Sequence, residues 1–368
     1  MNIFKRHKIP TIALLTSLLS ISPLSISAPG VGIETKSLDT LYQEAIQDGG
    51  KLVIWAGGDK PDQLSHIESR FKKRFPKIDL EVTVDLSKYL DARVDNGLQS
   101  GGYLPDVIQL QTLQDFDYWK QKGALTSYKP LGWDKVYAPF RDPEGAFIGV
   151  YGVSFSNVYN TSLVSDKDAP RDALDYLNPR LKGKIILTYP HDDDAVLYQF
   201  DKLITQYGWE YIHKLIEQDP VWVRGTAMPY VAVLSGKYPA SFTTFWPFKD
   251  RWGLPDTKFV TPKKDSFLTW VQTAAILKKA ENTKTAKLYM SWILSKEFQE
   301  DWLQFPVRND VEADAGMKTM FHHNTAPEDF RNFMRDRARV ERLKAQFEQL
   351  IGPVKGISPL DMDYSKVP

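Results

Sequence analysis

The spacing of apolar residues alternates along the chain between the period of a strand and the period of a helix. In the N-terminal part, short apolar or alternating runs that favour strands are each followed by a segment with apolar residues at helical spacing. These pairs are predicted at 51–56 with 64–75, 78–84 with 87–98, and 106–110 with 113–123. Repeated strand–helix alternation predicts α/β layers with a largely parallel sheet.

The same alternation starts again after a strand-rich middle section at 145–160. Further strands are predicted at 184–189, 221–223, 240–243 and 267–277, and further helices at 172–181, 194–207, 209–218, 228–235, 285–298 and 330–350. Two similar α/β blocks in series predict a molecule with two lobes. The length supports this, because about 340 residues after the N-terminal segment, with 42% hydrophobic content, exceed what one core usually holds.

The first 27 residues have the pattern of a secretory signal. A cationic start at 5–8 precedes an apolar run at 12–24, and small residues follow at 25–28. The apolar run, at about 13 residues, is shorter than the roughly 20 needed to cross a bilayer. We therefore predict that residues 1–27 are removed, with a retained membrane anchor as the alternative.

The composition limits the cellular compartment and the binding partners that can be expected for the chain. The chain has no cysteine, which excludes a disulfide scaffold, a thiolate metal site and the lipid-modified cysteine of a bacterial lipoprotein. Three of the 47 basic residues belong to the signal, so against 46 acidic residues the mature chain has a formal charge of about −2. Such a balance gives no reason to expect nucleic acid or an anionic membrane as a partner. A free periplasmic protein fits these facts.

The predicted topology also locates a candidate site. In open α/β sheets, ligands bind beyond the carboxyl ends of the strands, where loops and helix N-termini converge. In the first block, the residues at this position are Trp55, Gly57, Gly58, Asp59, Asp85, Lys88, Tyr89, Gln111, Thr112 and Asp115. In the second block, they are His191, Asp192, Asp193, Asp194, Arg224, Thr226, Thr244, Phe245 and Trp246. Tyr151, from the middle section, is a further candidate.

Several of these residues have structural alternatives. A tight turn is the alternative for Gly57 and Gly58. Helix capping is the alternative for Asp59, Asp85 and Asp115. The sequence leaves both interpretations open.

The acidic run at 192–194 bears on the charge of a ligand. One carboxylate is enough to cap the predicted helix that follows, so three in a row are more than a cap needs. Carboxylates at a helix start raise the electrostatic cost of bringing in an anion, which favours a cationic or polyhydroxylated ligand over a phosphate. Lys88 and Arg224 have the opposite effect, unless each pairs with one of the acids.

Three motifs give the chain a resemblance to a known family. They are Trp-Ala-Gly-Gly-Asp at 55–59, Pro-Asp-Val-Ile-Gln at 105–109, and Asn-Pro-Arg-Leu-Lys-Gly-Lys-Ile at 178–185. Together with the export signal they resemble the substrate-binding proteins of ABC importers, and most of all the branch that contains ferric-iron, thiamine, polyamine and phosphorylated-metabolite binders. The resemblance covers 51–305, and the motif at 178–185 is its most specific part.

The resemblance implies a type II periplasmic-binding-protein fold, in which two α/β lobes joined by hinge strands enclose a ligand cleft. It places the first lobe at 28–149 and 266–305, the hinge at 150–154 and 260–265, the second lobe at 155–259, and a helical extension at 306–368. This extension is longer than is usual for the branch. The resemblance also implies a monomer that closes around a small solute and delivers it to a membrane permease and its ATPase, without cofactor, metal site or catalytic residue.

The resemblance leaves the solute open. Ferric-binding members use phenolates from adjacent tyrosines, whereas the matching stretch here, at 243–246, is Thr-Thr-Phe-Trp. Tyr151, Tyr189, Tyr230 and His191, with the acids, keep ferric iron as an alternative, because iron(III) prefers oxygen donors.

The aromatic residues favour an organic solute. Trp55, Phe245 and Trp246 suit stacking on a flat ring or covering a cation, as in thiamine or polyamine binding. Packing inside a lobe is their structural alternative.

An enzyme is the alternative class of protein. The sequence contains no nucleophile elbow, no phosphate-binding glycine-rich loop and no His-Glu-x-x-His motif. Carboxylates that meet in space keep a secreted hydrolase as one alternative, and a scavenger or sensor domain with the same lobes is another. We predict a binding protein that is not an enzyme.

Overall fold

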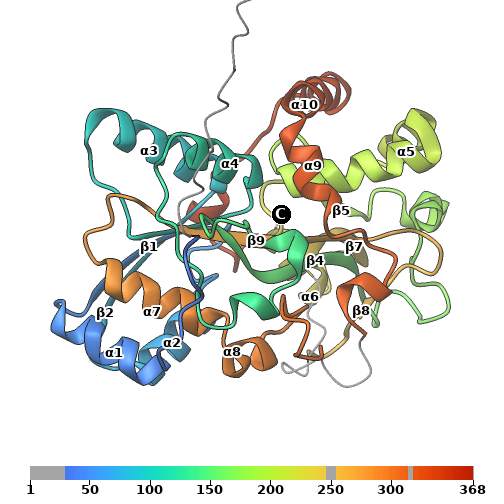
Figure 1. Cartoon of the computed structure of the whole chain (residues 1–368). Helices are drawn as coiled ribbons and strands as arrows, with labels where there is room; N and C mark the ends of the chain where they lie inside the picture. Colours follow the sequence, from blue (N-terminus) through green and yellow to red (C-terminus); the bar gives the residue numbers. More distant parts are fainter. Residues whose placement is uncertain (1–29, 246–253, 314–317, 368) are drawn as a thin grey trace, which may run out of the picture. The chain divides into compact units, whose positions relative to one another are not determined.

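The computed structural model describes residues 30–245, 254–313 and 318–367, so the predicted signal at 1–27 lies outside the described residues. The residues from Val31 onward form one unit. In this unit, strands lie between an upper and a lower set of helices (Figure 1).

The N-terminal strands form the parallel part of the main sheet. β1 (Lys51–Gly57) pairs in parallel with β2 (Asp79–Asp85) on one side and with β3 (Val107–Leu110) on the other. The helices of this part are α1 (Leu38–Gln47), α2 (Ser65–Arg74), α3 (Ser87–Ser100) and α4 (Leu113–Gln121). The three predicted strand–helix pairs are therefore confirmed, and α1 is an element that the sequence analysis missed.

The centre of the main sheet is antiparallel, so the prediction of a largely parallel sheet was wrong. β9 (Leu268–Ile276) lies between β3 and β4 (Ile148–Asn160) and is antiparallel to both. β7 (Ala240–Phe245) and β8 (Thr257–Val260) are also antiparallel to β4. The alternation of elements could not show this, because it does not reveal which distant strand inserts beside β3.

The remaining strands form a small second sheet. β5 (Ile186–Thr188) and β6 (Val221–Val223) are parallel. α5 (Asp194–Glu217) follows β5, and α6 (Ala227–Leu234) follows β6. The predicted division of α5 into two helices coincides with Gly208, whose backbone is non-helical at φ 72° and ψ 174°.

One predicted short helix, at 172–181, is replaced by two 3-10 turns. η3 (Ala173–Leu177) and η4 (Pro179–Leu181) are separated by Asn178, which is extended. The physical reason is Pro179, because proline disfavours helical backbone in the residue before it. The other 3-10 turns are η1 (Trp133–Lys135), η2 (Ala138–Phe140), η5 (Met320–His322) and η6 (Pro359–Asp361).

Two longer predicted helices, at 285–298 and 330–350, are each broken once. In their place are α7 (Thr283–Ile293) with α8 (Lys296–Asp301), and α9 (Asp329–Arg335) with α10 (Arg337–Ile351). The breaks fall at capping residues. The side chains of Ser295 and Asp336 accept hydrogen bonds from the backbone N–H groups of Phe298 and Arg339, which start a new helix.

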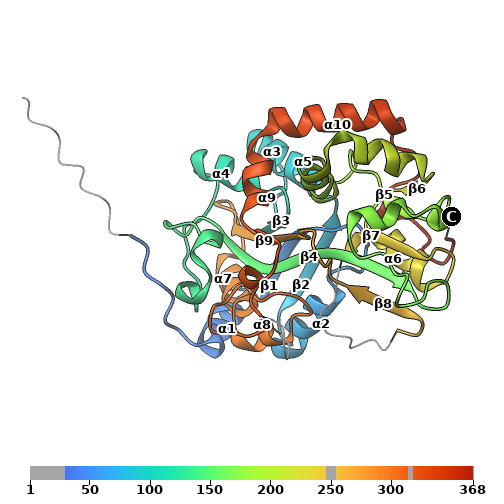
Figure 2. The same ribbon diagram turned by 90° about the vertical axis from the view of Figure 1, so that its right-hand side faces the viewer.

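Buried side chains form two main groups, which we call the first and second lobes. The first lobe contains β1–β3, α1–α4, α7 and α8. The second lobe contains β5–β7, α5 and α6, and its core also includes side chains of α9 and α10. β4, a long strand in Figure 2, takes part in both. Val150 belongs to the first core and Tyr159 to the second. The residue boundaries given above for the lobes and the hinge stay predictions.

Candidate functional site

The loop after β1 meets the N-terminus of α6. The carboxylate of Asp59 accepts hydrogen bonds from the backbone N–H and from the hydroxyl of Thr226, the latter at 2.8 Å. Because Thr226 makes no side-chain cap for α6, Asp59 of the first lobe supplies it. Thr244 donates a hydrogen bond to the carbonyl of Thr226 at 2.7 Å. Burial raises the pKa of Asp59, although the bonds from Thr226 oppose the shift.

A second contact between the lobes is an ion-paired group of three residues. Lys88, in the first turn of α3, donates to the carbonyl and carboxylate oxygens of Asp192 at 2.7 and 2.8 Å. Arg224 donates to the same carboxylate at 2.8 and 3.3 Å. Burial alone would raise the pKa of Asp192, but Arg224 and Lys88 together lower it. The two cations are thus committed to one buried acid.

The other two acids of the run also have partners. Asp193 caps α5, and its carboxylate accepts from the N–H groups of Ala195 and Val196 at 2.8 and 2.9 Å. Burial, with the nearby charge of Asp59, raises the pKa of Asp193 to about 7. Asp194 pairs with Lys344 of α10 at 2.9 Å. Capping therefore accounts for one of the three acids.

A carboxyl pair that the sequence analysis found only in part lies between α3 and α4. Burial, and then the negative charge of Asp91, raise the pKa of Asp115 to about 8. Burial also raises the pKa of Asp91, which is hydrogen-bonded to Asp115 and feels the charges of Asp95 and Asp194. The pair therefore holds a proton near neutral pH. The spacing of Asp91 and Asp95, one helical turn apart on α3, was the available signal.

The glycines after β1 allow a close approach of backbone to side chain. A Cβ on Gly57 would lie 2.0 Å from Oγ of Ser87, and a Cβ on Gly58 would lie 2.8 Å from Cγ1 of Val84. The hydroxyl of Ser87 also accepts a hydrogen bond from the N–H of Gln111 at 3.2 Å. Gly57 thus lets the ends of β1 and β3 pack against the start of α3, and Gly58 lets the loop after β1 pack against Val84 of β2.

Other predicted site residues surround these contacts. Thr112 is the residue before α4, and its hydroxyl lies beside Asp115. The carboxylate of Asp85 pairs with Arg93 and accepts from the N–H of Leu86, at the start of α3.

Tyr89, His191 and Phe245 also lie around these contacts, and the predicted site residue Trp246 lies outside the described residues. Tyr89 is exposed and its hydroxyl is hydrogen-bonded to Arg224. Burial lowers the pKa of His191. The ring of Phe245 lies 5.3 Å from that of Tyr230.

Two predicted site residues are packed in the first lobe, away from these loops. Trp55 is buried under α3 and α4, with its ring 6.2 Å from that of Tyr103. Tyr151 lies in the first core, where its hydroxyl accepts from Gln109 at 2.8 Å and its ring lies 4.2 Å from Trp302. The packing alternative given for Trp55 describes its position here.

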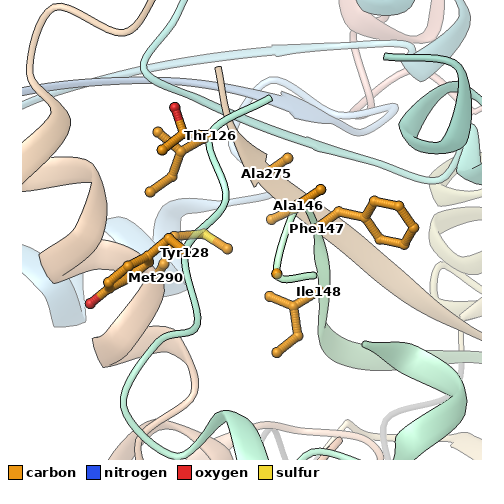
Figure 3. Close-up of a pocket in the computed structure, with 10 residues that line it drawn as sticks. Thr126, Tyr128, Ala146, Phe147, Ile148, Ala275 and Met290 are labelled. Carbon is orange, nitrogen blue, oxygen red and sulfur yellow. The ribbon is translucent and has the colours of Figure 1, made fainter. Parts of the chain in front are cut away.

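Two cavities lie elsewhere in the molecule. One, of about 10 Å³, is lined by Thr126, Tyr128, Ala146, Phe147, Ile148, Ala275 and Met290 with three further residues (Figure 3). It has the size of one water molecule. The other, of about 230 Å³, lies beside α9 and is lined in part by Leu113, Phe140, Val271, Arg331 and Arg335. Neither includes a residue of the Asp59 or Asp192 contacts.

Within 30–245, 254–313 and 318–367, no three or more His, Asp or Glu side chains are grouped as metal ligands. No helix in the same ranges has the length and apolar content of a membrane span.

The sequence of this chain matches a family model. Residues 104–322 match the family described as bacterial extracellular solute-binding protein, and the chain belongs to that family. A curated relative, an uncharacterized protein of Haemophilus influenzae, is 23% identical over 192 residues, which are 48% of this chain and 55% of the relative. The chain thus spans about half the length of the curated relative that it matches.

Solved structures share the fold. A substrate-binding protein of an ABC transporter from Agrobacterium tumefaciens superposes with a TM-score of 0.69 at 18% identity, over 81% of this chain and 93% of that chain. AfuA from Actinobacillus pleuropneumoniae, solved with fructose-6-phosphate, gives 0.66 at 20% identity, over 82% and 98%. Iron-bound HitA from Pseudomonas aeruginosa gives 0.64 at 17% identity, over 81% and 99%.

These comparisons confirm the predicted class. The chain has the type II periplasmic-binding-protein fold, with two α/β lobes, and is related to the solute-binding proteins of ABC importers. Members of the family are periplasmic or extracellular, and they bind small solutes and work with an ABC permease and its ATPase. The family is made of binding proteins.

Proposed function

We propose that this chain is the periplasmic solute-binding component of an ABC importer, and that it captures a small organic cation or a similar polar metabolite, such as a thiamine- or polyamine-like solute. The proposal rests on the meeting of the two lobes where β1, β2, β5 and β6 end, through Asp59 with Thr226 and Lys88 with Asp192. A solute held among these loops contacts both lobes. It therefore binds the closed form more tightly and raises its population.

The charge around these loops favours a cation. Burial and the charge of Asp91 raise the pKa of Asp115, and burial and the charges of Asp95 and of Asp194 in the second lobe raise the pKa of Asp91. A bound ammonium group would stabilise the ionised carboxyl groups. A phosphate would have to replace Asp192 as the partner of Lys88 and Arg224, which exchanges one set of charge-assisted hydrogen bonds for another.

Ferric iron is the second candidate solute. HitA was solved with iron bound, and carboxylate oxygens suit this hard cation. The adjacent phenolates expected of ferric-binding members are replaced by Thr243 to Trp246 in this sequence. An iron site would therefore have to use the aspartates together with Tyr189 or Tyr230.

Calorimetric titration of the mature chain with spermidine, thiamine, ferric citrate and fructose-6-phosphate tests these assignments. We expect saturable 1:1 binding of one amine, which tightens from pH 6 to pH 9 because Asp115 of the Asp91–Asp115 pair loses its proton around pH 8. Asp115→Asn should weaken amine binding at least about tenfold, in line with the loss of a charged hydrogen bond. Asp134→Asn, which changes an exposed carboxyl group paired with the neighbouring Lys135, is the control.

The other outcomes separate the alternatives. Saturable binding of fructose-6-phosphate without amine binding would overturn the cationic assignment, and binding of ferric citrate alone would support iron. Turnover of a panel of glycosides or esters would identify a secreted hydrolase instead.

A further inference from the structure

The helical extension leads into a C-terminal tail, 352–367, that crosses the loops of the candidate site. The backbone of Lys355, just beyond α10, is hydrogen-bonded to the hydroxyl of Tyr189. Further along, Pro359 packs so closely on Gly225 that a Cβ on this glycine would lie 2.7 Å from Cβ of Pro359. The tail therefore passes over the ends of β5 and β6, where the backbone of Gly352 is also hydrogen-bonded to His191.

The end of the tail is anchored on the second lobe. Met362, Tyr364 and Val367 pack against the apolar cluster around Val223 and Met228 of β6 and α6. Lys237, just after α6, donates a hydrogen bond to the carbonyl of Val367. The C-terminus accordingly lies beside α6 and β6 (Figure 2).

The same segment also contacts the first lobe. The hydroxyl of Tyr364 lies 2.8 Å from the carbonyl oxygen of Asp59 and 2.9 Å from that of Pro359. The ammonium of Lys60 lies 5.9 Å from the centre of the Tyr364 ring. Because the carboxylate of Asp59 is bound to Thr226, the tail joins the first lobe at the residue that already bridges the cleft.

The helices before the tail make the same kind of bridge. Arg335 of α9 pairs with Asp117 of the first lobe at 2.8 Å. Lys344 and Arg339 of α10 pair with Asp194 and Asp201 of the second lobe, at 2.9 and 2.8 Å. The whole extension is thus attached to both lobes, and the tail is its last attachment.

From these contacts we propose that residues 352–367 form a latch, in which Tyr364 ties the first lobe to a tail that is fixed on the second, so that the latch sets the balance between the closed and open forms. The inference rests on the proposed function, because it concerns the closure of the same cleft. Separation of the lobes has to break the bond between Tyr364 and Asp59. Loss of this bond should therefore shift the population toward the open form.

The test measures the distance between the lobes and needs no solute. The chain has no cysteine, so Lys72→Cys on α2 and Glu210→Cys on α5 give two specific positions for spin labels on the mature chain. Tyr364→Phe should raise the open population about three- to tenfold, the effect of losing one neutral hydrogen bond. Removal of residues 353–368 should raise it further. Tyr118→Phe, which changes an exposed tyrosine on α4, is the matched control.

The distance measurement, without and with an added solute, tests the latch and the proposed solute separately. The latch is overturned if Tyr364→Phe has the same distance distribution as the parent and Tyr118→Phe. If the truncated chain does not fold, the result for Tyr364→Phe alone tests the proposal. Spermidine is then added as the probe. Opening by Tyr364→Phe without any response to spermidine would keep the latch and reject the cationic solute, so the two proposals can fail separately.

Discussion

The pKa values of aspartates in the candidate site depend strongly on the surroundings of each side chain. Asp192 is buried between Arg224 and Lys88, which keep its pKa low against the effect of burial. Asp115 is buried beside another carboxyl group, Asp91, and its pKa rises to about 8. The first acid therefore favours folding when ionised, whereas the second opposes it when ionised.

This difference gives a pH-dependent prediction for Asp115→Asn. The pKa of Asp115 in the folded chain, about 8, lies above its ordinary value of 3.8, so the folded chain binds this proton more tightly than the unfolded chain. The stability of the parent should then fall as pH rises from about 4 to 8. Asp115→Asn should remove this loss and stabilise the chain by about 1–2 kcal/mol at pH 8, with little effect at pH 4.

Urea denaturation at the two pH values measures the effect. Asp117→Asn is the control on the same helix, because it deprives Arg335 of its partner and should not stabilise the chain at either pH. Equal free energies of unfolding for Asp115→Asn and the parent at pH 8 would contradict the shared proton. If Asp115→Asn both weakens amine binding and raises the free energy of unfolding, Asp115 contributes to ligand binding while it lowers the stability of the fold.

Among the elements, α3 and α6 are held in place by residues of other elements. α6 receives its cap from Asp59 in the loop after β1. α3 begins at Ser87, directly against Gly57 at the end of β1. Small changes at the carboxyl end of β1 should therefore affect both lobes.

Gly57→Ala tests this packing at the end of β1. The new Cβ would lie 2.0 Å from Oγ and 3.2 Å from Cβ of Ser87, so α3 or β1 has to move. We expect a loss of about 1–3 kcal/mol in the free energy of unfolding, as for other overpacked sites. Gly32→Ala, where no atom lies within 4 Å of the new Cβ, is the control. Equal melting temperatures for the two variants would refute the tight contact.

At the scale of the whole molecule, the two lobes are joined by more than a hinge. β4 has side chains in both cores, and β9 pairs with it along most of its length. The C-terminal helices add ion pairs to both lobes. A cleft can open in such a molecule only if the continuous strands bend while the contacts of Asp59, Lys88 and Tyr364 break.

The shared strands predict cooperative unfolding of the mature chain. Tryptophan side chains are buried in both cores, such as Trp292 in the first and Trp270 in the second. In urea, tryptophan fluorescence and far-ultraviolet circular dichroism should give coincident transitions. Two transitions separated in denaturant concentration would mean that each lobe is stable without the other.

The sequence predicted most elements because their signals are local. Apolar spacing located β1, β2 and β3 with their helices, whereas the helix expected at 172–181 was wrong because that range contains Pro179. The position of the candidate site also followed, because the ends of parallel strands place their loops together. Asp59 and Thr226, which the sequence predicts as site residues, are in direct contact.

Pairings between distant residues could not be predicted in the same way. The partners of Asp192, which are Lys88 and Arg224, decide whether this acid is free for a ligand, and only the folded chain brings them to it. The same holds for Asp91, which was not named although it changes the pKa of Asp115. Trp55 was predicted as a site residue because its aromatic ring suits stacking on a ligand, but the folded chain buries it in the core of the first lobe.

The sequence by itself determined the class of this protein, the order of its strands and helices and the loops where a ligand is expected, since these follow from local patterns and from motifs shared with a family. Only the tertiary structure decided the direction of β9, the partner of each buried charge and the path of the C-terminal tail. These depend on contacts between residues far apart in the chain. Such contacts form when burial brings the residues together, and they leave no periodic pattern in the sequence.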